Sequence, residues 1–442
     1  MGAIIPGRIL GLEGQVIKSV VFNEEMGRVR VVCVRDRRRC RPVDHRTGRR
    51  GGVHRLLRRT ILDVPIGGHP CEIEIEYAET FLSPGNVRVE ALPFVLPKAR
   101  VTKRFARLIA GMARHMPISA VARHTGLSWD SVKAIECAHL AETLVIPRPQ
   151  TLTGLRYLGV DEVARAKGQS YFTLVYDLSP GDNYGRILWV KEEREGAVLR
   201  EFLNALTPEC AAGIEAVALD MGPAYIAAVL ESLPNAAIVF DRFHVMQLFS
   251  KVIRDCRRAE FNAAKKFGDL IGQQAIKGSL WLLLSNRASL KETDQGRLNQ
   301  LLLQNQPLAT LYTLKEQLQR LWQPNSTRAA MAARLDDWCG MANAAKITGL
   351  AAFVKTLQSH RTGICAYADH PITTSRLEAG NVSIALLRRR ARGYRDMQYF
   401  KLKIFQLNTE DTPSFLYPNV PSHSAKTDLS SVGNPCRARI SV

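Results

Sequence analysis

The spacing of hydrophobic positions divides residues 155–245 into five strands and two helices. The segments with the length and apolar content of strands are LRYLGVDEV (155–163), SYFTLVYDL (170–178), RILWVKEER (186–194), IEAVALDM (214–221) and AAIVFDRFHV (236–245). The segments AVLREFLNAL and PAYIAAVLESL have helical spacing instead, and one side of the first is formed by Val198, Leu199, Phe202, Leu203 and Leu206. The fourth strand is apolar at every position between Glu215 and Asp220, as expected for a strand that is covered on both faces of its sheet.

This order of elements predicts a ribonuclease-H-like (retroviral-integrase-like) α/β core. The first three strands can follow one another as hairpins, whereas the last two are reached through helices. In such a fold the first and fourth strands are neighbours, so we expect Asp161 and Asp220 to lie side by side. Adjacent carboxylates repel each other unless a cation is present, and hard divalent cations prefer oxygen ligands. The pattern therefore predicts a site for two metal ions about 4 Å apart, which can act on both oxygens exchanged in phosphodiester cleavage.

A third carboxylate is expected on a helix that follows the last strand. In the segment TTSRLEAGNVSIALLRRRARGYRDMQYFKLKIF (373–405), Glu378 lies in the first turn of a helical pattern whose apolar stripe is Leu377, Ile384, Leu387 and Ala391. The arginines that follow are candidates for contacts with the DNA backbone: Arg388, Arg389, Arg390, Arg392 and Arg395. A surface amphipathic helix with a solvated charge run has the same pattern, so the catalytic interpretation depends on the two aspartates.

The flanking regions differ from this core in composition and in hydrophobic periodicity, so we expect a multidomain α+β protein. Residues 1–100 are Arg-rich and contain alternating strands such as CEIEIEY (71–77), which predicts a small β-rich domain. Residues 101–150 have helical patterns, and residues 151–405 form the expected catalytic domain, with a helical insertion at about 250–370. Residues 406–442 lack periodicity and are expected to form a poorly ordered tail.

The segment PISAVARHTGLSWDSVKAIE (117–136) has the spacing of a helix-turn-helix. Ala122 is small enough for two helices to cross closely, and Gly126 suits the positive φ of a tight turn. Ser128 is expected to cap a second helix that extends to about Glu136. Its first turns present three side chains to a DNA major groove: Trp129, Asp130 and Lys133. An ordinary helical hairpin uses the same packing, but the nearby arginines favour DNA binding.

Charge and cysteine usage narrow the class of protein further. The formal net charge of +20 favours nucleic acid as a partner. Thirteen arginines lie between Arg28 and Arg59, against Asp36 and Asp44 only, and both a DNA contact and a solvated basic face are open for this run. No apolar run approaches the roughly 20 residues of a membrane span, and the first residues lack the form of a signal peptide. The nine scattered cysteines favour reduced thiols in the cytoplasm.

Four blocks in a characteristic order resemble one known family. They are YLGVDEVARAKGQSY (157–171), ALDMGPAYIAAV (218–229), VFDRFHV (239–245) and LEAGN…RRRARGY (377–394). The chain resembles bacterial insertion-sequence transposases of the DDE superfamily, specifically the ISL3 family. The segment DVPIGGHPCEIEIEY (63–77) is also similar, so the resemblance extends over nearly the whole chain before the tail.

The resemblance implies roles for the matching residues. Asp161, Asp220 and Glu378 are expected to bind two Mg²⁺ ions, for which Mn²⁺ can substitute. Asp241 and His244 are expected to support the active site or the DNA, with a packed histidine as the alternative for His244. Glu162 is expected to point away from the metals, because successive residues of a strand alternate between its faces.

The expected zinc ribbon of this family is not intact in the sequence. Many relatives carry two cysteine pairs near the N-terminus, whereas Cys33 and Cys40 are separated by six residues and Cys71 has no near cysteine partner. His45, His54 and His69 could substitute as ligands, but nothing in their spacing demands it. We therefore expect a zincless or degenerate ribbon.

The family implies an activity and partners. The N-terminal part and the helix-turn-helix would bind the terminal inverted repeats of an insertion sequence, and the triad would nick the DNA and join the exposed 3′-hydroxyl to target DNA. Two paired ends imply at least a dimer in the DNA complex. The protein is expected in the bacterial cytoplasm, associated with the nucleoid when it is bound to DNA, and no membrane partner is expected. The rivals are a ribonuclease-H-like nuclease that cuts without joining and a DNA-binding regulator with a dead catalytic core.

Overall fold

The structure is a computed structural model that describes residues 5–6, 10–36, 42–43, 48, 50–83, 86–97, 99–166, 170–193, 195–240, 242–323 and 326–409. Their contacts divide the chain into two compact units. Unit 1 comprises Met1–Val145 and Leu387–Val442, and unit 2 comprises Ile146–Leu386. Within the described ranges, no helix combines the length and apolar character needed to cross a membrane.

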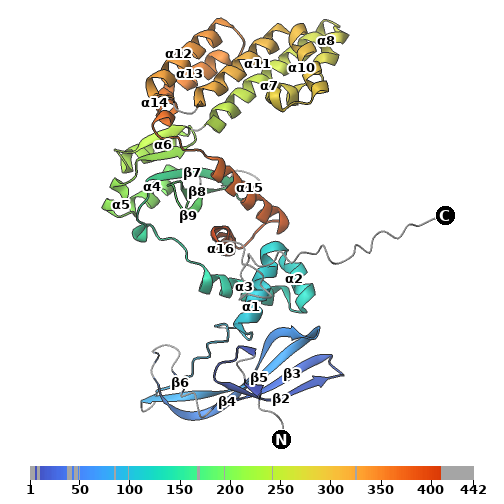
Figure 1. Cartoon of the computed structure of the whole chain (residues 1–442), viewed down its shortest axis with the longest axis vertical. Helices are drawn as coiled ribbons and strands as arrows, with labels where there is room; N and C mark the ends of the chain where they lie inside the picture. The colour runs from blue at the N-terminus through green and yellow to red at the C-terminus, as the bar shows by residue number, and fades with distance from the viewer. Residues whose placement is uncertain are drawn as a thin grey trace, which may run out of the picture. The chain divides into compact units, whose positions relative to one another are not determined.

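Unit 1 begins with a six-stranded sheet in the order β1-β2-β3-β5-β4, with β6 paired to β5 (Figure 1). Its strands are β1 (Ile5–Pro6), β2 (Gln15–Asn23), β3 (Arg28–Arg35), β4 (Gly52–Ile66), β5 (His69–Ser83) and β6 (Asn86–Val89). The expected alternation of β5 is confirmed, because Cys71, Ile73 and Ile75 are buried in the apolar core of the sheet. The β-rich character expected for this region is thus present.

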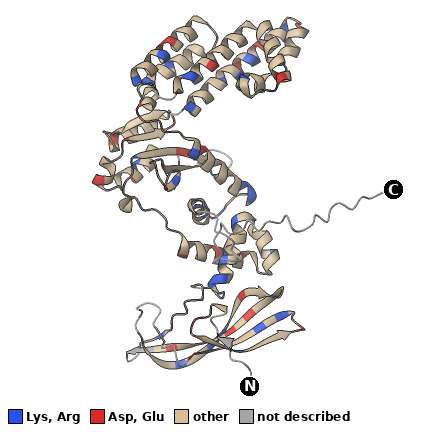
Figure 2. Ribbon diagram, in the orientation of Figure 1, with Lys and Arg blue, Asp and Glu red and all other residues tan. Residues whose placement is uncertain are grey.

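The acidic residues of β5 neutralise part of the arginine run. Arg28 pairs with Glu72, and Arg30 pairs with Glu74 at 2.6 Å, so cation and carboxylate come from neighbouring strands. Figure 2 shows acidic and basic segments side by side on this sheet. Arg35 at the end of β3 also has an acidic partner, Glu90, which follows β6 and forms a buried pair with it at 3.0 Å. These pairs favour a structural role for the described arginines of the run, a role that the local sequence around them did not reveal.

The two described cysteines of the expected ribbon lie in the core of this sheet. Burial raises the pKa of Cys33 to about 12 and that of Cys71 to about 11, so both thiols are neutral at physiological pH. Both side chains are part of the apolar cluster that forms the core of the sheet. Cys40 and His45 lie outside the described residues.

The expected helix-turn-helix is present in unit 1. It consists of α2 (Ile118–Thr125) and α3 (Trp129–Thr143), which pack against α1 (Lys103–His115). Gly126 has the expected positive φ of 71°, and the Ser128 hydroxyl accepts a hydrogen bond from Ser131 N at 3.1 Å as the N-cap. The second helix is longer than expected, because its buried face continues past Glu136 to Leu140.

The C-terminal helix α16 (Met397–Phe405) and a following turn (Gln406–Asn408) also belong to unit 1. The tail was expected to begin at residue 406, but the Gln406 side chain is buried and accepts a hydrogen bond from Lys403 Nζ at 2.6 Å. Residues 410–442, which hold the rest of the expected tail, lie outside the described residues.

Unit 2 contains a five-stranded sheet in the order β11-β10-β7-β8-β9. The strands are β7 (Tyr157–Ala164), β8 (Tyr171–Asp177), β9 (Arg186–Glu192), β10 (Ala216–Leu219) and β11 (Ala237–Phe240). β7, β8 and β9 are antiparallel neighbours, whereas β10 runs parallel to both β7 and β11. The expected adjacency of the first and fourth strands is therefore confirmed.

Helices cover both faces of this sheet. On one face lie α4 (Gly196–Asn204) and α6 (Pro223–Ser232), with the short α5 (Pro208–Ala212) between them in sequence. On the other face the first turns of α15 (Ser375–Arg390) approach β7 so closely that a Cβ atom at Gly159 would lie 2.8 Å from Leu377 Cδ1. Glycine at this position therefore allows α15 to lie directly on the sheet.

The expected insertion is helical throughout its described part, apart from connecting turns. Its helices are α7 (Arg242–Lys266), α8 (Leu270–Ile276), α9 (Leu280–Leu284), α10 (Glu292–Gln304), α11 (Gln306–Gln319), α12 (Arg328–Ala344), α13 (Leu350–Ser359) and α14 (Arg361–Cys365). Short 3-10 turns occur at Arg287–Ser289, Arg320–Trp322 and Ala366–Ala368, and another, Pro149–Thr151, precedes β7. The rings of Phe249, Trp338 and Phe353 contact one another at 5.2 to 5.7 Å between centroids and join three of these helices.

Two expected elements end earlier than predicted. The fifth strand was expected to reach residue 245, but β11 ends at Phe240 and α7 begins at Arg242, because Val245, Phe249 and Ile253 form a buried helical stripe. The helical pattern expected over 373–405 is interrupted between Arg390 and Met397. Arg392 and Arg395 therefore lie in the connection between two helices and not on one long helix.

Candidate active site

Two acidic residues from neighbouring strands lie side by side in unit 2. The parallel register pairs Ala216 with Tyr157 and Ala218 with Gly159, and continued by two residues it places Asp220 beside Asp161. Burial raises the pKa of Asp161, and the charge of Asp220 acts in the same direction, as expected for neighbouring carboxylates. The predicted meeting of these aspartates is therefore present in the structure.

The protonation of Asp161 is set by opposing effects. Burial is the largest and raises its pKa, and the neighbouring charge of Asp220 acts in the same direction. The backbone N–H of Glu162, the charge of His244 and the amide of Asn381 favour the ionised form instead. The net direction is upward, so this carboxylate is costly to ionise in the absence of a cation.

Hydrogen bonds fix the orientation of both carboxylates. Asp161 Oδ1 accepts from Glu162 N at 2.7 Å, and Asp161 Oδ2 accepts from Asn381 Nδ2 at 2.7 Å. Asp220 Oδ1 accepts from Gly222 N at 2.9 Å in the turn that leads into α6. Each oxygen of a carboxylate has two lone pairs, so every one of these atoms keeps acceptor capacity for a ligand.

The third predicted acid, Glu378, lies on the helix that covers these aspartates. Asn381, which contacts Asp161, follows Glu378 by three positions, and residues three apart share one face of a helix. Within the described residues, however, no three acidic, histidine or cysteine side chains are grouped closely enough to enclose a metal ion. The structure thus places Asp161 and Asp220 together, whereas a position of Glu378 beside them stays a prediction, supported by the contact of its helix with Asp161 through Asn381.

Of the two predicted supporting residues, Asp241 and His244, the structure describes only His244. His244 lies in the first turn of α7, and its charge lowers the pKa of Asp161, which places it within electrostatic range of the aspartates. Its ring also contacts Phe243 at 5.6 Å between centroids. Asp241 lies outside the described residues.

Glu162 lies on the opposite face of β7 from Asp161. Asp161 faces α15 through Asn381, whereas Glu162 interacts with the Tyr225 hydroxyl of α6 and helps to raise the pKa of Tyr225. The alternation of side chains along the strand accounts for this separation. Glu162 therefore offers a natural comparison for any test of Asp161.

The sequence analysis assigned no role to Asn381. Its amide nitrogen donates to Asp161, and its oxygen accepts from the Tyr176 hydroxyl of β8 at 3.3 Å. The signal that identifies it is its spacing of three residues from Glu378 on a helix whose first turn already carried a candidate acid. Asn381 is a positioning residue, because it acts through Asp161.

Replacing Asn381 with alanine is expected to lower the rate of DNA cleavage by about 10- to 100-fold, the usual loss when a partner that orients a ligand is removed. DNA affinity is expected to stay unchanged. Val382→Ala is the matched control, since Val382 is the next residue on the helix and is 59% exposed. Cleavage by the Asn381 variant at the wild-type rate would show that its hydrogen bond to Asp161 is dispensable.

The residues predicted to contact DNA lie in unit 1. Trp129 is 48% exposed at the start of α3, and Lys133 lies one turn later, 5.7 Å from the centroid of the Trp129 ring. Arg388, Arg389 and Arg390 end α15, and Arg392 follows it. Lys133 is also paired with Asp396 at 2.7 Å, so it is partly neutralised.

Comparison with known proteins agrees with this arrangement. Residues 158–404 match a family described as a transposase, the DDE transposases of the ISL3 type, and residues 90–136 match the helix-turn-helix domain of transposase family ISL3. These matches define the class, a DNA-transposing enzyme with a separate DNA-binding domain. The chain belongs to the ISL3 family of DDE transposases.

Two relatives illustrate the similarity. The chain is 33% identical over 399 residues to the transposase for insertion sequence element IS1001 of Bordetella parapertussis, covering 89% of this chain and 95% of that protein. It is 28% identical over 329 residues to the transposase for insertion sequence element IS1557 of Mycobacterium tuberculosis, covering 70% of this chain and 72% of that protein.

Proposed function

We propose that this transposase binds the terminal inverted repeats of its insertion sequence and catalyses both DNA cleavage and strand transfer at Asp161, Asp220 and Glu378. The observation that carries the proposal is the pairing of β7 with β10, which brings Asp161 and Asp220 together, and the helix that bears Glu378 contacts Asp161 through Asn381. The strand order β9-β8-β7-β10-β11, with its first three strands antiparallel, supports a ribonuclease-H-like catalytic core.

The two aspartates fit a site for divalent cations. Their carboxylates repel each other, and burial makes the ionised form of Asp161 more costly, so a cation of charge two offsets both effects. Oxygen ligands of this kind suit Mg²⁺, with Mn²⁺ as a substitute. Two such ions, held by these carboxylates, would supply Lewis acidity at the scissile phosphate and neutralise the charge that develops there.

The protein's own residues prepare this site. Glu162 N, Asn381 Nδ2 and Gly222 N hold the aspartate carboxylates in fixed orientations. Leu377 of α15 packs directly on β7 at Gly159, two residues before Asp161. His244 would support the site from the first turn of α7, where its positive charge, when the ring is protonated, favours ionised Asp161. The family pattern gives Asp241 the same supporting role.

DNA recognition is assigned to unit 1. Trp129 and Lys133 would enter the major groove from the start of α3, while Arg388, Arg389, Arg390 and Arg392 would contact the phosphate backbone. Two ends must be held for one transposition event, so we expect at least a dimer in the DNA complex.

Strand transfer separates this proposal from a plain nuclease. The substrate is a duplex that carries the terminus of the insertion sequence that encodes this protein. It is supplied either uncut or pre-cut with its 3′-hydroxyl exposed, together with a plasmid target and Mg²⁺. We expect nicking of the uncut duplex and covalent joining of the pre-cut one, both lost in EDTA. Nicking without joining would identify a nuclease, and specific binding with neither reaction would identify a regulator.

A further inference from the structure

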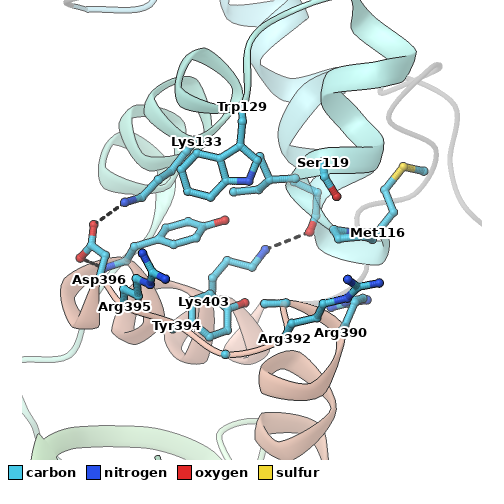
Figure 3. Close-up of a pocket in the computed structure, with 16 residues that line it drawn as sticks. Met116, Ser119, Trp129, Lys133, Arg390, Arg392, Tyr394, Arg395, Asp396 and Lys403 are labelled. Atoms are coloured by element: carbon cyan, nitrogen blue, oxygen red, sulfur yellow. Dashed lines mark hydrogen bonds and ion pairs between the residues drawn. The ribbon is translucent and has the colours of Figure 1, made fainter. Parts of the chain in front are cut away.

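Unit 1 contains a cavity of about 620 Å³ between the helix-turn-helix and the connection from α15 to α16 (Figure 3). Trp129 and Lys133 of α3 line one wall, and Met116 and Ser119, at the junction of α1 and α2, line another. The facing wall is the segment 390–396, which we call the arginine loop after Arg390, Arg392 and Arg395. The residues at the head of the recognition helix thus share one cavity with arginines more than 250 positions later in the chain.

The cations around this cavity are not equivalent. Lys403 Nζ is saturated by Glu136, Gln406 and the carbonyl oxygen of Ala113, and Lys133 pairs with Asp396. In contrast, none of the three arginines of the loop forms an ion pair with any residue that the structure describes, and Arg392 and Arg395 are exposed. Three uncompensated guanidinium groups on one side of a cavity favour an anion with several charged oxygens.

Hydrogen bonds at the end of α15 fix the backbone of the loop. α15 ends in a Schellman motif, in which Gly393 N donates to Arg388 O at 2.9 Å and Arg392 N donates to Arg389 O at 3.1 Å. Arg392 occupies the left-handed position of this motif with φ 58°. Glycine is the usual residue there, because a Cβ atom disfavours positive φ. The motif thus holds Arg392 in a backbone conformation that glycine would adopt with less strain.

The geometry points to a composite DNA site: the arginine loop binds backbone phosphates of the same duplex whose major groove receives the start of α3. This inference rests on the proposed function and adds to it that the arginines after Glu378 act with the helix-turn-helix. The ligand is duplex DNA, since a recognition helix in a major groove is flanked by the phosphates of both strands. Arg390 and Arg392 lie toward α2 and Arg395 toward Lys133, so the three arginines are spread along the cavity (Figure 3).

Salt dependence of DNA binding tests the inference on the full chain. Each phosphate contact contributes about 0.9 to the slope of log affinity against log salt, so the triple variant Arg390→Gln, Arg392→Gln, Arg395→Gln is expected to lose about 2.7 from that slope. Its affinity at 0.1 M salt is expected to fall by roughly 10²- to 10³-fold. The loss should be similar on an end duplex and on a scrambled duplex of equal length, because phosphates carry no sequence information.

The control removes the same charge elsewhere. Arg200, Arg258 and Arg297 form surface ion pairs in unit 2, and their triple glutamine variant should keep the wild-type slope within about 1. A loop variant that behaves like this control overturns the inference. If the wild-type protein shows no preference for the end duplex, the proposed function is contradicted instead. The difference in salt slope between the wild type and the loop variant, on either duplex, would still decide the role of the loop.

Arg392→Gly separates binding from folding. Relief of the strained backbone is expected to raise the Tm by about 2 °C, while loss of one phosphate contact weakens DNA binding about tenfold at 0.1 M salt. Opposite signs for the two measurements support the inference. Unchanged or tighter DNA binding by this variant overturns it, whatever the Tm does.

Discussion

Replacing Asp220 with asparagine is expected to abolish cleavage and joining of transposon ends, with a loss of at least about 10³-fold, the upper range for removing one group that stabilises transition-state charge. Asp161→Asn should have the same effect, because the two carboxylates lie side by side. DNA affinity should persist in both variants, since recognition is assigned to unit 1. Glu162→Gln is the matched control: it is adjacent to Asp161 in sequence but lies on the opposite face of β7, beside Tyr225.

A stability measurement complements this activity test. Without divalent cations, Asp220→Asn removes a repulsive charge and should leave the Tm unchanged or higher. Addition of Mg²⁺ should raise the Tm of the wild type, because a ligand that binds only the folded state stabilises it, and should raise that of the variant much less. Full activity in Asp220→Asn, or an equal response to Mg²⁺ in both proteins, would refute the assignment of this carboxylate.

Replacing Lys403 with methionine is expected to destabilise unit 1 by about 3–5 kcal/mol, as is usual when one partner of a buried ion pair is removed. Lys403 is 2% exposed and Glu136 is fully buried, and their side chains meet at 2.7 Å between α16 and the recognition helix α3. Burial lowers the pKa of Lys403, although Glu136 favours its charged form. Without the ammonium group, the Glu136 carboxylate keeps the Tyr399 hydroxyl but lacks a counter-ion.

The double variant Glu136→Leu, Lys403→Met distinguishes an ion-pair effect from a packing effect. Removal of both charges should restore much of the stability, because apolar residues of similar volume can replace a buried pair. Gln398→Met serves as the surface control on the same helix, since Gln398 is exposed. Thermal unfolding and DNA binding measure the result. A single Lys403 variant as stable as the control would mean that the pair contributes little to folding.

The elements of unit 2 could be predicted because their signals are local. Four consecutive apolar residues identify β10 as a buried strand. An apolar run that leads into Asp161 and Glu162 identifies β7. The helix-turn-helix could likewise be predicted from the positive φ expected at Gly126 and the N-cap expected at Ser128, because neither feature needs a distant partner. The two aspartates followed from the topology, since strand order determines which chain segments become neighbours.

Other features depend on partners far away in the chain. The glutamates that neutralise Arg28 and Arg30 are 44 positions distant, so a charge count within the run could not include them. The contact of Asn381 with Asp161 joins residues 220 positions apart. The end of α15 at Arg390 depends on a motif with arginine in the place of glycine, which the usual stop signal for a helix does not reveal.

The pairing of Lys403 with Glu136 has a consequence for biosynthesis. The two residues are 267 positions apart, so at about 5–20 residues per second a ribosome needs roughly 13 to 53 s to reach the lysine after it has made the glutamate. During this interval the nascent recognition helix carries a carboxylate without its ammonium partner. Chains that terminate before Lys403 keep the unpaired Glu136 carboxylate. Only a chain that also contains the whole catalytic region can form the ion pair that holds the helix-turn-helix against α16.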